Sequence, residues 1–294
     1  MRVLITGGGG FLAGHLSAHL QTVAGLEVHT LTRADCDLSK DNEQLRSVLR
    51  SFQPARVIHL AGRISGSEPE LDRDNRLATV NLLESMRQEA PGARVVLGST
   101  TAVYRDCGTA AAPVVESQAT VPRGPYAASK YAAEQAARGH LEAGAWIAIA
   151  RMSNPVGSHM NVALLPGTLA KQIVEIERGE PPILTLRDLS PKRDFLSARD
   201  CARALWRIAE HGTPGAIYNV ASGVSVSIAE IVEIYRSLAR VRAIEVKSLP
   251  AAGERSSVQE QWVSNAKLLA LGWRPQETLR DAIRDQLDAE RARA

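Results

Sequence analysis

The sequence is poor in the features that mark nucleic-acid-binding or disulfide-stabilised proteins. Lysine and arginine number 35 against 32 aspartates and glutamates, so the formal net charge is only +3. Since no predicted element carries a run of basic residues, we expect no nucleic-acid partner. The 3 cysteines are odd in number and form no CxxC or CxxH motif. This argues against disulfides and against a metal site, and it favours a reducing compartment.

Long apolar runs and a leader peptide are also missing. No apolar run approaches the ~20 residues that are needed to cross a bilayer. The apolar start of the chain breaks into glycines after Ile5 and Thr6, which is not the pattern of a signal peptide. We therefore expect a cytoplasmic protein with no membrane partner. Apolar residues make up 45% of the chain and charged residues 23%, as in ordinary globular domains.

The first half of the chain alternates between strand-like and helix-like segments. Short, mainly apolar runs rich in β-branched residues fit strands, and amphipathic runs between them fit helices. Such an alternation predicts a parallel sheet covered on both faces. The expected fold is therefore α/β, a doubly wound parallel sheet of the Rossmann type. The strands are expected at the chain start and within 27–33, 56–62, 93–100 and 146–151, and the helices within 11–23, 41–52, 76–88 and 126–141.

The alternation weakens after Arg151. Residues 154–167 look like a loop, and prolines interrupt 180–200. We expect a second, smaller α/β lobe here that binds the substrate. The predicted division gives the dinucleotide-binding domain residues 1–155 and 195–221, and the smaller domain residues 156–194 and 222–294.

A glycine-rich loop follows the first strand. Within TGGGGFLAGHL, Gly7, Gly10 and Ala13 have the spacing GxxGxxA, directly between a strand and a helix. The first glycine permits a tight turn, the second admits a pyrophosphate, and the small third residue lets the helix pack on the strand. The loop predicts a dinucleotide site, although glycines also make ordinary turns.

The end of the second strand indicates which dinucleotide is bound. Thr32 and Arg33 stand where an acidic residue would bind a ribose 2′-hydroxyl. A 2′-phosphate would suit Arg33, which favours NADPH over NAD; the alternative is a solvated surface arginine. Asp37, next to Leu38, either hydrogen-bonds the adenine amine or caps the helix that follows.

Tyr126 and Lys130 lie four residues apart just after Pro125, so a helix that begins there places both on one face. A phenol titrates at about 10, and a nearby ammonium is expected to lower its pKa and make it a usable proton donor. The same spacing occurs by chance on many helices. Residues 99–101 carry hydroxyl groups and end the preceding strand, at the edge of the sheet where ligands bind in such folds. One of these hydroxyls could hold the substrate oxygen that Tyr126 would protonate.

These motifs together resemble a known family. TGGGGFLAG, HLAG, STTAVY, YAASK, RMSNPVG and KRDF occur in the order and spacing of the extended short-chain dehydrogenases/reductases, the NAD-dependent epimerase/dehydratase family. The similarity covers nearly the whole chain. Within the family, residues 169–205 together with IYNVASG and LGWRP are most similar to the GDP-4-keto-6-deoxy-D-mannose reductases.

The resemblance implies a set of functional residues. The catalytic residues would be Thr100, Tyr126 and Lys130. Tyr126 and Lys130 would also contact the cofactor, with Gly7, Gly10, Phe11, Leu12, Arg33, Asp37, Leu38, Leu60, Ala61 and Gly62. The substrate would be bound by Thr100, Asn154, Lys171, Arg193 and Arg255, although Lys171 could equally form a surface ion pair.

The implied reaction is the NADPH-dependent reduction of the C4 keto group of a nucleotide-diphosphate 4-keto-6-deoxyhexose, as in deoxysugar biosynthesis. Thr101 and Ala102 stand where related dehydratases carry an acidic pair, so elimination of water lacks an acid or base. The alternatives are an NAD-dependent nucleotide-sugar 4-epimerase and a non-catalytic dinucleotide sensor. Arg187 and Asp188 replace the usual Gly-Asn of the mannose reductases, which leaves GDP and dTDP both open.

A homodimer is also expected, because related proteins pair through the helix within 76–88 and the helix of Tyr126. Leu77, Val80, Leu83 and Met86 form an apolar stripe that would suit this role. The alternative is that the stripe packs against the sheet.

Overall fold

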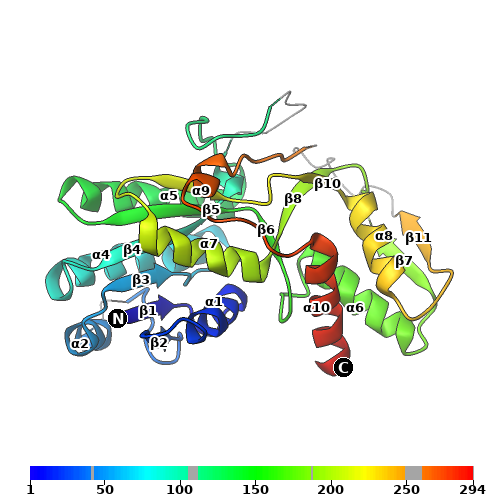
Figure 1. Cartoon of the computed structure of the whole chain (residues 1–294), viewed down its shortest axis with the longest axis horizontal. Helices are drawn as coiled ribbons and strands as arrows, with labels where there is room; N and C mark the ends of the chain where they lie inside the picture. The colour runs from blue at the N-terminus through cyan, green and yellow to red at the C-terminus, as the bar shows by residue number, and fades with distance from the viewer. Residues whose placement is uncertain (41–42, 105–111, 187, 249–259, 294) are drawn as a thin grey trace.

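The central element is a parallel sheet of six strands (Figure 1). The computed structural model describes residues 1–40, 43–104, 112–186, 188–248 and 260–293. The strand order is β2-β1-β3-β4-β5-β9, so the chain winds in opposite directions from β1, as in doubly wound folds. The predicted fold class is confirmed. The strands are β1 (Arg2–Thr6), β2 (Glu27–Leu31), β3 (Arg56–His59), β4 (Arg94–Thr100), β5 (Ile147–Met152) and β9 (Ile217–Val220).

Helices cover both faces of this sheet. Side chains alternate along a strand, so Val3 and Ile5 of β1 pack on one face and Leu4 on the other. The first face is covered by α1 (Phe11–Gln21) and α7 (Ala198–His211). The second face is covered by α2 (Glu43–Phe52), α4 (Ala78–Glu89) and α5 (Gly124–Glu142).

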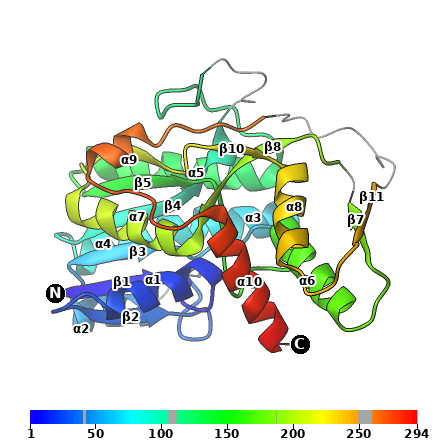
Figure 2. The ribbon, with the colours of Figure 1, turned by 45° about the vertical axis from the view of Figure 1, so that its right-hand side comes forward.

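The smaller lobe has its own core and two small sheets, gathered at the right of Figure 2. Val156, Ile173, Phe195, Tyr235 and Leu287 are among the buried residues of this core. The sheets are formed by β10 (Ser225–Ser227), β8 (Lys192–Ser197) and β6 (Asn154–Val156), and by β11 (Glu245–Ser248) with β7 (Ile183–Leu186). The helices are α6 (Leu165–Glu177), α8 (Ile228–Leu238) and α10 (Leu279–Arg293).

The interpretation of residues 154–167 as a loop is wrong at both ends. Asn154–Val156 forms β6, which pairs in parallel with β8, and α6 begins at Leu165. Three residues that include a proline carry too little periodicity to predict a strand, and β6 exists because β8 supplies its partner. Two of the three predicted domain boundaries fall inside β6 and β8, and the division of the chain into those two domains stays a prediction.

The helical region before β4 is longer than its sequence pattern indicates. It consists of α3 (Glu68–Leu71), the π-helical turn η1 (Asp72–Leu77) and α4. Leu83 and Met86 are buried in the core against the sheet, whereas Leu77 and Val80 remain partly exposed. Two of the four residues of the predicted dimer stripe therefore pack in the core, as the alternative interpretation predicts.

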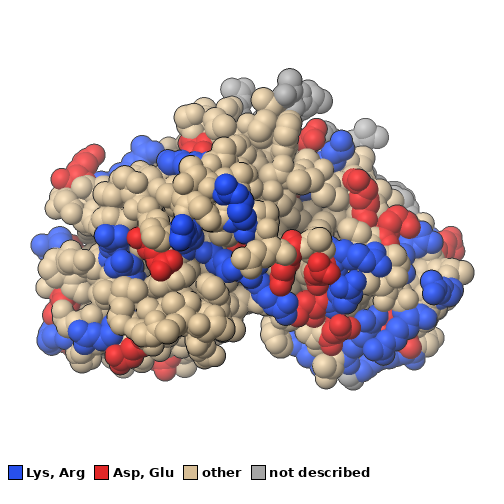
Figure 3. All heavy atoms as spheres, in the orientation of Figure 1, with Lys and Arg blue, Asp and Glu red and all other residues tan. Residues whose placement is uncertain are grey.

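Ion pairs connect the two lobes. Arg199 of α7 binds Glu277 at 3.0 Å and also Asp285 of α10, whose carboxylate accepts a hydrogen bond from the backbone N–H of Ser158 at 3.2 Å. Figure 3 shows the indentation between the lobes, with Lys and Arg interspersed with Asp and Glu beside it. Among the described residues, no helix has the length and apolar character required to span a bilayer.

Candidate active site

The glycine loop is wedged between the ends of β2 and β3. Gly7 has a φ of +77°, and a Cβ atom there would lie 2.7 Å from the backbone nitrogen of Ala61. The N–H of Gly8 donates to the carbonyl of Leu31 at 2.8 Å. Only glycine fits the first position, because both the positive φ and the close approach exclude a side chain.

The loop leads into the N-terminus of α1. Gly10 is the N-cap residue, and α1 has neither a side-chain cap nor an acidic residue in its first turn. Ala13 is buried in the core below the loop. The first amide groups of α1 therefore lack a protein side-chain partner, which is the arrangement that binds the phosphates of nucleotides. Phe11 and Leu12 are half-buried beside it.

Thr100 and Tyr126 are brought together from the end of β4 and the first turn of α5, where the Thr100 hydroxyl lies near enough to act on the Tyr126 phenol. The neighbouring hydroxyls have other partners. Ser99 donates to Glu134 at 2.5 Å, and Thr101 accepts a hydrogen bond from Nε2 of Gln261 at 2.9 Å. Of the three hydroxyls that the sequence left open, Thr100 is the one that contacts Tyr126.

Lys130 is buried one turn after Tyr126, beside the end of β3. A Cβ atom on Gly62 would lie 3.9 Å from its Nζ, and the positive charge also acts on His59. Burial lowers the pKa of Lys130 to about 8, although the charge of Glu134 acts in the opposite direction. The ammonium group is therefore easier to deprotonate than an exposed lysine.

The expectation that Lys130 lowers the pKa of Tyr126 is wrong in direction. Burial raises the pKa of Tyr126, and the polar side chain of Thr100 offsets this only in part. The physical reason is that removing a phenolate from water disfavours its negative charge. At neutral pH the Tyr126 phenol consequently keeps its proton.

His59 lies below Lys130 in a line of hydrogen bonds. Its Nδ1 is 2.6 Å from Oγ1 of Thr6, and its Nε2 is 3.1 Å from Oγ1 of Thr79. Thr79 already donates its hydroxyl proton to the carbonyl of Asn75 at 2.7 Å. The Nε2 atom of His59 must therefore donate, and Nδ1 must accept from Thr6, which assigns a neutral tautomer.

A buried ion pair holds α5 against the sheet. Glu134, one turn after Lys130, accepts hydrogen bonds from Nε and Nη2 of Arg151 at 3.0 and 2.6 Å. Arg151 also lies over the ring of Tyr104, with 4.6 Å to the ring centroid. Tyr126, Lys130 and Glu134 thus share one face of α5, and Glu134 anchors the middle of the helix to β5.

Arg33 forms an ion pair that its sequence position does not predict. Its Nη1 and Nη2 donate to Asp74 at 3.1 and 3.0 Å. Arg63 and Arg73 donate to the same carboxylate. The hydrogen bonds and positive charges of these arginines hold the pKa of the Asp74 carboxyl well below its usual range.

Asp37 binds Ser39. Its Oδ1 accepts hydrogen bonds from the N–H and hydroxyl of Ser39 at 3.1 and 2.7 Å, and residues 41–42, directly before Glu43 of α2, lie outside the described residues. Leu38 is buried, whereas Leu60 and Ala61 are half-buried beside the glycine loop. The adenine contacts of Asp37 and Leu38 remain predictions.

Two of the predicted substrate residues, Asn154 and Arg193, lie on paired strands of the smaller lobe. Asn154 donates to the carbonyl of Asp194 at 2.7 Å, and Arg193 is the preceding residue on β8. Lys171 is exposed on α6 and pairs with Glu175 at 3.6 Å, as the surface alternative predicts. Arg255 and Arg187 lie outside the described residues.

Known proteins are similar to this chain in both sequence and fold. The chain matches the NAD dependent epimerase/dehydratase family over residues 3–221. It is 32% identical over 298 residues to the GDP-6-deoxy-D-mannose reductase of Pseudomonas aeruginosa, with 96% of this chain and 95% of that protein covered. This chain belongs to the NAD dependent epimerase/dehydratase family. The resemblance inferred from the motifs is confirmed.

Solved structures of the family have the same architecture. RMD from Pseudomonas aeruginosa complexed with NADPH matches with a TM-score of 0.89 and 29% identity, over 100% of this chain and 99% of that chain. The UDP-glucose 4-epimerase of Thermus thermophilus complexed with NAD matches with a TM-score of 0.86 and 27% identity, over 100% of both chains. Because a reductase and an epimerase share this fold, the residues of the site must decide between them.

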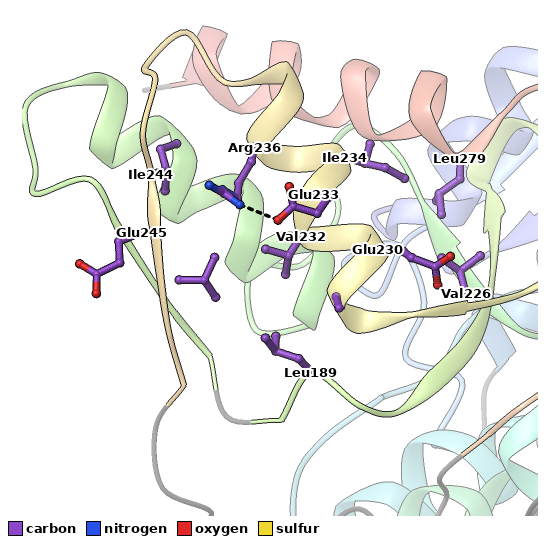
Figure 4. Close-up of a pocket in the computed structure, with 12 residues that line it drawn as sticks. Leu189, Val226, Glu230, Val232, Glu233, Ile234, Arg236, Ile244, Glu245 and Leu279 are labelled. Carbon is purple, nitrogen blue, oxygen red and sulfur yellow. Dashed lines mark hydrogen bonds and ion pairs between the residues drawn. The ribbon is translucent and has the colours of Figure 1, made fainter.

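A groove in the smaller lobe lies apart from the predicted site residues (Figure 4). Its volume is about 670 Å³, and its lining is mainly apolar, from α8, β11 and neighbouring segments. Glu233 and Arg236 in this lining pair with each other at 2.6 Å. None of the predicted site residues lines this groove.

Some residues of the site were missed by sequence reasoning. Glu134 could have been found, since it continues the four-residue spacing of Tyr126 and Lys130. His59, Asp74 and Gln261 carry no comparable signal, because their partners are distant in the sequence.

Proposed function

We propose that the protein catalyses the NADPH-dependent reduction of the C4 keto group of a nucleotide-diphosphate 4-keto-6-deoxyhexose, linked to GDP or dTDP. The placement of Thr100 beside Tyr126, at the carboxyl edge of the sheet, carries this proposal. In a doubly wound fold this edge is where ligands bind. The similarity to a GDP-6-deoxy-D-mannose reductase over 96% of the chain supports it.

The residues present fit a dinucleotide phosphate. The glycine loop excludes side chains at Gly7, and the first turn of α1 has no side-chain cap or acidic residue to compete with a phosphate. When bound, NADPH supplies the hydride. Its proposed contacts are Gly7, Gly10, Phe11, Leu12, Arg33, Asp37, Leu38, Leu60, Ala61, Gly62, Tyr126 and Lys130.

The protein's own task is to hold the carbonyl and to provide a proton. Because burial raises its pKa, Tyr126 keeps the phenolic proton until the carbonyl oxygen accepts it. Thr100 positions the same oxygen through its hydroxyl. Lys130, with its pKa lowered to about 8, can return a proton to the phenolate.

The environment beyond Thr100 favours plain reduction over elimination. The Thr101 hydroxyl accepts a hydrogen bond from Gln261, and Ala102 has no polar side chain. Elimination of water requires an acid and a base near C5 and C6 of the sugar, and neither residue provides one.

A second candidate is a nucleotide-sugar 4-epimerase, favoured by the match to an epimerase structure over the full chain. Epimerisation would use a retained NAD and would consume no external reductant. The arginines at the end of β2 and β3 favour NADPH instead.

We further propose that Asn154, Lys171, Arg193 and Arg255 bind the nucleotide diphosphate, the last three from the smaller domain and Asn154 from its border. The pairing of β6 with β8 supports this for Asn154 and Arg193. A cytoplasmic homodimer without nucleic-acid or membrane partners is proposed as well. Light scattering on the purified protein tests the dimer.

The test of function is incubation with NADPH and a panel of GDP-, dTDP- and CDP-linked 4-keto-6-deoxyhexoses, followed by NMR of the product. A reductase consumes NADPH and gives a 6-deoxyhexose with a C4 hydroxyl. Interconversion of C4 epimers without added NADPH would instead establish the epimerase. NADPH binding without turnover of any sugar would leave only a dinucleotide sensor.

A further inference from the structure

Three arginines from different parts of the chain meet on one carboxylate, that of Asp74. Arg33 follows β2, Arg63 follows β3, and Arg73 precedes Asp74 in the turn η1. Their guanidinium groups donate five hydrogen bonds to Asp74, with lengths of 3.1, 3.0, 2.7, 2.8 and 3.2 Å. Asp74 is only 6% exposed, whereas the arginine side chains are 34–55% exposed.

This arginine cluster, defined as Arg33, Arg63, Arg73 and Asp74, lies beside the glycine loop. Gly8 bonds to Leu31, two residues before Arg33, and Gly7 packs on Ala61, two residues before Arg63. The two arginines therefore leave the strands on either side of β1 and converge at the carboxyl edge of the sheet. A dinucleotide seated on the glycine loop would place its adenosine ribose on this side.

The chemistry of Asp74 excludes the role that an acidic residue has in NAD-selective sites. There the carboxylate accepts hydrogen bonds from the ribose hydroxyls. Two bonds to Oδ1 and three to Oδ2 already fill the four or so acceptor positions of Asp74. A ribose 2′-hydroxyl consequently finds no free acceptor at this carboxylate.

The cluster instead presents donors to an anion, because the arginine side chains are 34–55% exposed whereas the Asp74 carboxylate that holds them is buried. Two further carboxylates lie at its edge, Asp37 at 3.6 Å from Arg33 and Glu70 at 3.4 Å from Arg63. Asp37 also accepts a hydrogen bond from Ser39 and Glu70 one from Ser67, and both remain negatively charged and offset part of the positive charge at the rim of the cluster. Guanidinium groups held in place lose little entropy when a phosphate binds.

We propose that Asp74 is a positioning residue that gathers Arg33, Arg63 and Arg73 into a binding site for the 2′-phosphate of NADPH. The inference rests on the proposed function and extends it from Arg33 to the whole cluster. Arg63 is a second phosphate ligand. Asp74 acts through the arginines and does not touch the cofactor.

The experiment measures binding of 2′,5′-ADP and 5′-AMP by calorimetry, which needs no turnover. Arg63→Gln is expected to weaken 2′,5′-ADP binding by about 10-fold with little effect on 5′-AMP, as for the loss of one charge-assisted hydrogen bond. Arg76→Gln is the matched control, since Arg76 pairs with Asp72 in the same helical turn at 2.6 Å, outside the cluster.

The Asp74→Asn variant distinguishes a positioning role of Asp74 from a purely electrostatic effect of its charge on phosphate binding. Removing a negative charge near a phosphate should tighten binding if charge alone decides. If Asp74 positions the arginines, 2′,5′-ADP binding weakens instead, by about 10-fold. Thermal unfolding of each variant checks that it folds. If Asp74→Asn fails to fold, Arg63→Gln still tests the inference.

The outcomes distinguish this inference from the proposed function. If Arg63→Gln and Asp74→Asn match Arg76→Gln while Arg33→Gln loses the preference for 2′,5′-ADP, the inference is overturned and the NADPH assignment stands. If the unmodified protein binds 5′-AMP as tightly as 2′,5′-ADP, the NADPH assignment fails as well, whatever sugar it turns over. Tighter 2′,5′-ADP binding by Asp74→Asn overturns the positioning role.

Discussion

Glu134 of α5 accepts two hydrogen bonds from the guanidinium group of Arg151 on β5, and both side chains are almost completely buried. The pair joins the helix of Tyr126 and Lys130 to the central sheet. A buried charge that loses its partner is strongly unfavourable, because no water replaces the lost interaction.

Replacing Glu134 by Gln should therefore destabilise the protein. The free energy of unfolding is expected to fall by about 3–5 kcal/mol, since Arg151 is left as an uncompensated buried charge. Urea denaturation measures this. The double variant Glu134→Leu with Arg151→Met should be more stable than Glu134→Gln, because it removes both charges. A loss below about 1 kcal/mol in Glu134→Gln would show that the pair contributes little.

The stability of the protein should depend on pH through His59. Burial and the charge of Lys130 lower the pKa of His59 from 6.5 to about 3. Below pH 6.5 the unfolded chain binds a proton that the folded protein does not, so this contribution to stability is present above pH 6.5 and is lost as the pH falls toward 3. The loss approaches about 1.4 kcal/mol per pH unit.

The His59→Gln variant isolates this effect. It should be less stable than the unmodified protein at pH 7, and the difference in free energy of unfolding should shrink as the pH falls from about 6.5 to about 4.5. Urea denaturation across this range provides the comparison. A constant difference would mean that His59 has the same pKa in the folded protein and in the unfolded chain.

The contact between Thr100 and Tyr126 predicts a difference between neighbouring hydroxyls. Tyr126→Phe and Thr100→Val should each lower kcat by about 100-fold, because they remove the proton donor or the group that positions the carbonyl oxygen. Thr101→Val, whose hydroxyl is bound by Gln261, should have a much smaller effect. Steady-state kinetics with the best sugar of the panel tests this, and equal losses for Thr100→Val and Thr101→Val would contradict it.

The glycine loop predicts a position-specific cost of a single methyl group. Gly7→Ala should lower the Tm, because the residue has a positive φ and its Cβ would meet the backbone of Ala61. Gly9→Ala is the matched control, since nothing lies within 4 Å of a Cβ built there. Both are measured by thermal unfolding without nucleotide. A similar Tm for the two variants would argue against the wedged loop.

Local patterns determined much of the molecule. The glycine spacing and the alternation of apolar strands with helices were sufficient for the doubly wound sheet, because strand and helix periodicity are properties of short segments. The order of the motifs was sufficient for the family. Tyr126 and Lys130 share a helix face for the same local reason.

Only the tertiary structure decided what depends on partners that are distant in sequence. It selected Thr100 over Ser99 and Thr101, because Glu134 and Gln261 bind the other two hydroxyls. It reversed the expected pKa shift of Tyr126, since burial raises this pKa and outweighs the effect of Thr100, and burial is not visible in the spacing of Tyr126 and Lys130. It also joined Arg33 to Asp74, 41 residues further along, which no periodicity encodes. The sequence supplies the groups, and packing decides which charges and hydrogen bonds each one meets.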